Sequence, residues 1–86
     1  MKAELKQLGV VGVDSGQLII TDPCYIDSLP NYKKLCDING QVYFRDGHPA
    51  AGVKIEDFGG DGIFPVFGEY DKDGLLVKVV IDLERS

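Results

Sequence analysis

The stretch "GLLVKVVIDLE", residues 74–84, decides the fold. Aliphatic side chains recur in it at every second position, and several of them are β-branched. This period of two is typical of a half-buried β-strand. The preceding run "DGIFPVFGEY", residues 61–70, is also apolar, and the connector "DKDG" suits a turn that closes on Gly74. The two runs therefore predict a β-hairpin.

Pro65 interrupts the first arm of this hairpin. Proline has no N–H group to donate to a neighbouring strand. We therefore expect this arm to be an edge strand, or to carry a bulge at Pro65.

Two further hairpins are predicted nearer the amino terminus. "CDINGQVYFR", residues 36–45, places Asn39-Gly40 between apolar arms, which is the strongest short hairpin pattern. "LGVVGVDSGQLIIT", residues 8–21, does the same with a glycine-closed turn. "GVKIEDF", residues 52–58, adds another short strand.

Helix is expected only between these strands. The 11 glycines and 4 prolines divide the chain into short pieces, and only "DSLPNYKKLC" at 27–36 could hold at most one helical turn, near 28–35. About six short strands indicate an all-β fold, a small antiparallel barrel or sandwich. We expect a single small β domain over residues 1–86.

Size and charge limit the partners. A chain of 86 residues buries a modest core, so self-association as a homo-oligomer would help to stabilise it. The net charge is −5 and Lys33-Lys34 is the only basic pair, which argues against a nucleic-acid partner. No apolar run has the length of a signal peptide or membrane span, so the sequence predicts a cytoplasmic protein without a membrane partner.

The segment "IITDPCYIDSLP", residues 19–30, raises a question of chemistry. Asp22 before Pro23 is typical of a turn, because the aspartate side chain bonds a following N–H and proline fixes φ. The alternative is a thiol-dependent enzyme, with Cys24 as nucleophile, His48 as base and Asp22 or Asp61 orienting the base. The turn interpretation is favoured, because no local signature supports catalysis.

A metal site is a second alternative. Cys24, Cys36, His48 and an aspartate would satisfy the ligand count of zinc, which would make the protein a zinc-stabilised domain. Neither cysteine has another cysteine or a histidine two to four residues away, as structural zinc sites usually do. We therefore expect no metal and no cofactor.

The run "FGGDGIFPVF", residues 58–67, contains three glycines around an aspartate. It lacks the Lys-Ser/Thr sequel of a phosphate-binding loop. Asp61 stands at the start of an aromatic strand and could line a pocket with four aromatic residues: Tyr25, Tyr43, Phe64 and Phe67. Core packing explains these aromatic residues with fewer assumptions.

Two blocks also resemble a known family. "GVDSGQLIITDPCYI" at 12–26 and "GDGIFPVFGEYDKDGLLVKVVIDL" at 60–83 are similar to a family of uncharacterised bacterial, archaeal and phage proteins. That family carries Val-Asp-Ser/Ala-Gly, Asp-Pro-Cys-Tyr and Gly-Asp-Gly-aromatic-Pro-Val blocks. The resemblance covers about half of the chain, not residues 27–58, and implies no activity. The positions that match its motifs are Asp14, Asp22, Cys24, Tyr25, Asp61 and Pro65.

The leading hypothesis is a small cytoplasmic binding module without chemistry of its own. It would bind a protein partner or a small ligand through the loops after Thr21 and before Ile63. The expected contact residues are Asp22, Tyr25, Asp61 and Phe64. A thiol-dependent enzyme and a zinc-stabilised domain stay open as alternatives.

Overall fold

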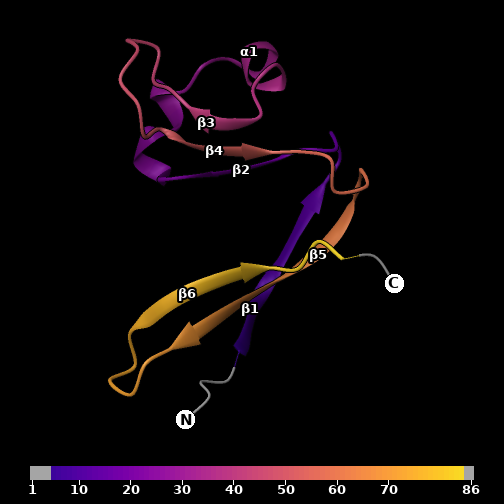
Figure 1. Ribbon diagram of the computed structural model, residues 1–86, viewed down its shortest axis with the longest axis vertical. Coiled ribbons are helices and arrows are strands. Elements are labelled where there is room, and N and C mark those ends of the chain that lie inside the picture. Colours follow the sequence, from indigo (N-terminus) through magenta and orange to yellow (C-terminus); the bar gives the residue numbers. More distant parts are fainter. Residues whose placement is uncertain (1–4, 85–86) are drawn as a thin grey trace. The chain divides into compact units, whose positions relative to one another are not determined.

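The computed structural model describes residues 5–84, and they form two compact units (Figure 1). One unit comprises the chain up to Asp14 together with the chain from Asp61 onward, and the other comprises Ser15–Gly60. The expectation of one domain stays a prediction. No helix within residues 5–84 is long and apolar enough to cross a membrane.

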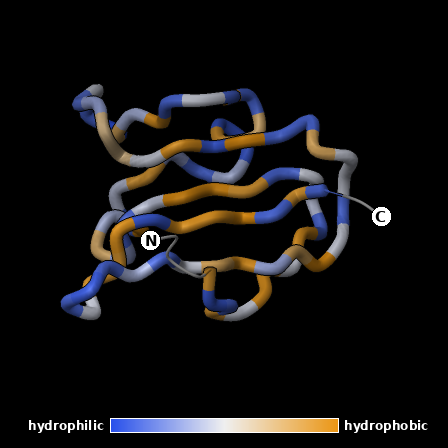
Figure 2. The backbone as a smooth tube through the Cα atoms, turned by 60° about the horizontal axis from the view of Figure 1, so that its bottom comes forward, coloured by the Kyte–Doolittle hydropathy of each residue, from blue (hydrophilic) through white to orange (hydrophobic). Residues whose placement is uncertain are grey.

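The all-β prediction is confirmed. Each unit is built on an open three-stranded antiparallel sheet, with strand orders β1-β5-β6 and β2-β4-β3, so neither sheet closes into a barrel. Hydrophobic residues run along the strands, and hydrophilic residues occupy the connecting turns (Figure 2). The elements in chain order are β1 Leu5–Val13, β2 Leu18–Thr21, the 3₁₀ helix η1 Pro23–Ser28, α1 Tyr32–Cys36, β3 Gly40–Val42, β4 Gly52–Ile55, β5 Gly62–Tyr70 and β6 Leu76–Ile81.

The predicted β5–β6 hairpin is confirmed. Asp71 and Leu75 close its turn with a 2.9 Å bond from the Asp71 N–H to the Leu75 carbonyl. Gly74 lies within this turn at a φ of 84°, in the left-handed region that glycine enters without a steric penalty. The alternating apolar residues of β6 are less buried than a half-buried strand predicts, since Val77 and Val79 are 56% and 53% exposed.

The prediction that Pro65 marks an edge strand or a bulge is wrong. β5 is the central strand of its sheet, and its register shifts lie elsewhere, between Gln7 and Gly9 of β1 and next to Tyr70. The Pro65 carbonyl accepts a 3.1 Å bond from the Asp82 N–H, just beyond the end of β6. In an antiparallel sheet the nitrogen and the carbonyl of one residue point to the same neighbouring strand. The Pro65 nitrogen therefore points toward Asp82, where β6 has already ended, so its lack of an N–H removes no hydrogen bond between β5 and β6.

The two hairpins predicted nearer the amino terminus are also wrong. β1 pairs with β5, and β2 pairs with β4, so the Asp14-Ser15-Gly16 bend joins strands of different sheets. Asn39-Gly40 leads into β3, which pairs with β4 after a long loop. The Ala51 N–H closes that loop with a 3.1 Å bond to the Val42 carbonyl.

Two short helices stand where at most one turn was expected. α1 lies within the predicted segment, and the Asn31 side chain caps it by accepting a 3.0 Å bond from the Lys34 N–H. η1 was not expected, and it begins at Pro23, whose fixed φ suits the first position of a helix.

The core of the β2-β4-β3 unit joins its sheet to α1 and to the connecting loops. Its centre is made of Leu29, Val42 and Ala51, which are 9%, 0% and 1% exposed. Half-buried apolar side chains pack against this centre: Ile19, Leu35, Ile38 and Phe44. Of the two helices, α1 contributes Leu35, whereas η1 contributes no side chain to this core. The core therefore fixes α1 and the loop around Phe44 on one sheet.

Candidate functional site

The Asp22 corner forms the start of η1. The Asp22 carboxylate accepts a 2.9 Å bond from the Cys24 N–H, and the Asp22 carbonyl accepts one of 2.9 Å from the Tyr25 N–H. These are the bonds of a helix N-cap, which satisfy N–H groups that a helix leaves free at its start. The predicted turn is therefore what this segment forms.

The Cys24 thiol is exposed and holds its proton firmly. Its hydrogen bond to the Asp22 carboxylate, with lesser effects of desolvation and of the negative charge, raises the pKa of the thiol above 9.0. In return, the Cys24 backbone N–H and then its thiol lower the pKa of Asp22 below 3.8. Thiol nucleophiles are activated by the opposite shift, which increases the thiolate fraction.

His48 lies in the loop between β3 and β4 and is exposed. Its Nδ1 is 2.7 Å from the Pro49 carbonyl oxygen, and its ring tilts against Phe44 at a centroid distance of 6.0 Å. Among residues 5–84 no hydrogen bond joins this ring to Cys24. The geometry gives the thiol-enzyme alternative no support.

The residues proposed as zinc ligands make other contacts. Cys36 accepts a 3.1 Å hydrogen bond from Gln17 Nε2. Within the described part of the chain, no group of three or more His, Cys, Asp or Glu side chains is arranged to hold a metal ion.

The four residues predicted to contact a ligand are divided between the two units. Asp22 and Tyr25 belong to Ser15–Gly60, whereas Asp61 and Phe64 belong to the other unit. Phe64 is 4% exposed, which suits packing better than ligand contact. The convergence of the two pairs stays a prediction.

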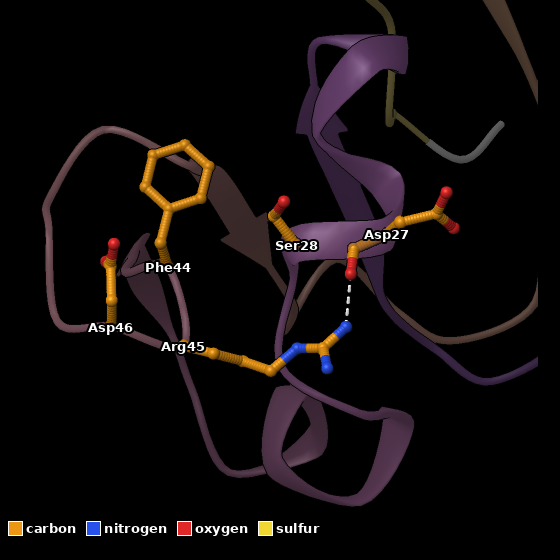
Figure 3. A pocket seen from close by; sticks show the side chains of 5 residues that line it. All are labelled: Asp27, Ser28, Phe44, Arg45 and Asp46. Carbon is orange, nitrogen blue, oxygen red and sulfur yellow. Dashed lines mark hydrogen bonds between the residues drawn. The ribbon is translucent and has the colours of Figure 1, made fainter.

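Tyr25 contacts Phe44, which belongs to a surface that the sequence indicated only through Tyr43. Its ring meets Phe44 edge-on, with centroids 4.8 Å apart and planes at 82°. The next residue, Arg45, extends below η1 (Figure 3). Its Nε donates to the Leu29 carbonyl at 3.0 Å, and its Nη2 donates to the Asp27 carbonyl.

Among residues 5–84, no carboxylate forms an ion pair with Arg45. Figure 3 shows the guanidinium at the main-chain carbonyl of Asp27, while the carboxylate of Asp27 points away from it. The Asp46 carboxylate is engaged by the His48 N–H at 3.0 Å. Since Arg45 has five N–H donors and uses two on carbonyls, a planar donor edge remains for another group.

Within the described part of the chain, Arg45 lines at least these three hollows. The smallest, of about 230 Å³, also contacts Lys34, and one of about 350 Å³ lies on the η1 side. The largest, of about 710 Å³, is called the Arg45 hollow below. Its wall combines apolar and basic side chains: Pro30, Lys34, Ile38, Tyr43, Phe44 and Arg45.

The Arg45 hollow joins two cations to an apolar surface. Lys34 and Arg45 both line it, with Asp37 and Gln41 as its other polar residues, so it carries a local positive excess in a chain of net charge −5. Tyr43 is 51% exposed and offers an open aromatic ring. The chemistry suits a ligand that has an anionic group and an apolar body. The sequence predicted Tyr43 as a possible pocket residue, but beside Asp61, and it predicted only a strand for Phe44 and Arg45.

Comparison with family models, with curated proteins and with solved structures found no match. The resemblance to the uncharacterised family stays a prediction.

Proposed function

We propose that the protein is a small non-catalytic binding module, and that its ligand is a small aromatic or aliphatic acid bound in the Arg45 hollow. The observation that supports this most is the meeting of Lys34 and Arg45 on one apolar wall. A volume of about 710 Å³ falls within the range of small-molecule sites.

Binding would use an anchored arginine. The two carbonyls that hold Arg45 reduce the side-chain entropy that it would lose on binding. The remaining N–H groups could meet a carboxylate, and a charge-assisted bond of this kind is about twice as strong as a neutral one. Pro30, Ile38 and Tyr43 would cover the apolar body of the ligand.

Binding without catalysis is supported by the thiol chemistry. The pKa of Cys24 is raised rather than lowered, and His48 faces a carbonyl. Two free cysteines are also ordinary in a reducing compartment, which supports a cytoplasmic location. A homo-oligomer belongs to the same proposal, while nucleic acid and membrane surfaces are not proposed partners.

A titration with benzoate, followed by backbone amide chemical shifts, tests the proposal. Neutral benzamide is the matched ligand. We expect benzoate to shift residues around Lys34, Ile38 and Tyr43–Arg45, and benzamide to shift them far less. An acidic peptide in a separate arm tests a protein partner, and exclusive binding of that peptide would overturn the small-acid proposal.

Two neighbouring lysines give the matched variants. Lys34 lines the Arg45 hollow, whereas Lys33 does not, although both lie exposed in α1. We expect Lys34→Gln to weaken benzoate binding several-fold and Lys33→Gln to leave it unchanged. Equal effects of the two variants, or the absence of shifts at the hollow, would overturn the proposal.

A further inference from the structure

Lys54 is a charged side chain in a buried place. It lies in β4, the central strand of its sheet, opposite Ile19 of β2 and Gly40 of β3. Only 2% of it is exposed. A buried ammonium group is costly unless hydrogen bonds replace its lost hydration.

Within residues 5–84, the Lys54 ammonium group has no hydrogen bonds that replace its lost hydration. Glu56 Oε2 lies 3.4 Å from Lys54 Nζ and forms an ion pair with it, but the Glu56 side chain is 36% exposed. Among the described residues, no hydrogen-bond acceptor is bound to this buried nitrogen. The ammonium group of lysine has three N–H donors, and all three are available for hydrogen bonds here.

A small hollow lies beside this side chain. Its volume is about 120 Å³, and Lys54 lines it together with the polar residues Ser15, Gln17 and Tyr32. The Gln17 amide is already oriented, because its Nε2 donates to Cys36 Sγ at 3.1 Å. Leu35 of α1 supplies an apolar part of the wall. The hollow therefore places hydroxyl groups able to donate beside a buried ammonium group whose N–H donors have no hydrogen-bond acceptor among residues 5–84.

We infer that this hollow is a second binding site, separate from the Arg45 hollow, and that it takes the carboxylate of a small monocarboxylic acid such as formate or acetate. Lys54 supplies the positive charge, and the hydroxyls of Ser15 and Tyr32 are the further donors. Glu56 lies close to Nζ, so its charge opposes an anion there. This repulsion favours a single negative charge over a phosphate dianion.

Acetate, with acetamide and inorganic phosphate as comparison ligands, tests the assignment at constant ionic strength. The readouts are the side-chain signal of Lys54 and the amide shifts around Ser15, Gln17 and Tyr32. We expect saturable shifts with acetate, and much weaker ones with acetamide and phosphate. No saturation with acetate, or equal binding of acetamide, would overturn the inference.

Variants test the charge argument in both directions. Lys54→Met keeps a long apolar side chain, and we expect it to weaken acetate binding by about tenfold or more. Glu56→Gln removes the opposing charge and should strengthen binding. If Lys54→Met does not fold, Glu56→Gln still tests the inference, with the side-chain signal of Lys54 as the readout. Unchanged or weaker acetate binding in Glu56→Gln would contradict the inference.

The two proposals fail separately. Lys34→Gln should leave the acetate shifts at Lys54 intact, since Lys34 does not line this hollow. If benzoate does not bind in the Arg45 hollow, the inference about the Lys54 hollow is unaffected. If acetate does not bind in the Lys54 hollow, the proposal about the Arg45 hollow is likewise unaffected.

Discussion

Arg45 Nε donates a hydrogen bond to the main-chain carbonyl of Leu29 at 3.0 Å. This bond, together with the bond from Nη2 to the Asp27 carbonyl, ties the loop after β3 to the end of η1. Carbonyls at a helix end have no partner within the helix, so an arginine side chain satisfies them from outside. The same contact fixes one wall of the Arg45 hollow.

Arg45→Lys should destabilise the fold while keeping the positive charge. Lysine lacks the planar fork that reaches two carbonyls at once. We expect a loss of about 1–2 kcal/mol in the free energy of unfolding, measured by urea denaturation. Lys72→Ala, in the exposed β5–β6 turn, is the control and should change the free energy by less than about 0.5 kcal/mol. Equal effects of the two variants would show that the carbonyl contacts contribute nothing.

Cys24 should react slowly with alkylating reagents near neutral pH. Because its thiol pKa is raised, the thiolate fraction of Cys24 near neutral pH is smaller than that of an ordinary cysteine. In a Cys36→Ser background, which leaves one thiol, the apparent pKa from the rate of iodoacetamide labelling should fall when Asp22→Asn removes the carboxylate. Fast labelling at neutral pH, or an unchanged rate in Asp22→Asn, would contradict the assigned hydrogen bond.

The Asp22–Cys24 pair should also shape the pH dependence of stability. The pKa of Asp22 is lowered in the folded state, so its contribution is present above 3.8 and is lost as the pH falls below that value. The pKa of Cys24 is raised, so its contribution is present below 9.0 and is lost as the pH rises through the folded-state value. Urea denaturation of wild type and Asp22→Asn should therefore differ least at the two extremes of pH. A constant difference at every pH would contradict this linkage.

The core around Val42 should be sensitive to truncation. Val42 is fully buried, and Val42→Ala should cost about 2 kcal/mol of unfolding free energy because it leaves a cavity. Val53→Ala, on neighbouring β4, is the matched control, since Val53 is 40% exposed. Urea denaturation should give a much smaller loss for Val53→Ala, and a similar loss would contradict the assigned core.

The sequence predicts pairing correctly between strands that are neighbours in the chain, and not between strands that are distant in the chain. The DKDG turn predicted the β5–β6 hairpin correctly, because both arms are neighbours in the chain. Asn39-Gly40 and Asp14-Ser15-Gly16 reverse or bend the chain locally, but their arms pair with β4 and β5. A turn pattern determines local conformation and carries no information about a distant pairing partner.

The candidate sites were harder to predict for a related reason. In "GVKIEDF" Lys54 alternates with Val53 and Ile55, a pattern typical of a solvent-facing lysine. The structure buries Lys54 and leaves Val53 40% exposed. The Arg45 hollow likewise joins α1 to the loop after β3, and only the tertiary fold brings these segments together.

Intermolecular nuclear Overhauser effects measure most directly whether an organic acid occupies the Arg45 hollow. With benzoate near saturation, its ring protons should show contacts to the side chains of Ile38 and Tyr43. Contacts only to side chains outside the Arg45 hollow, or none at saturation, would contradict the account.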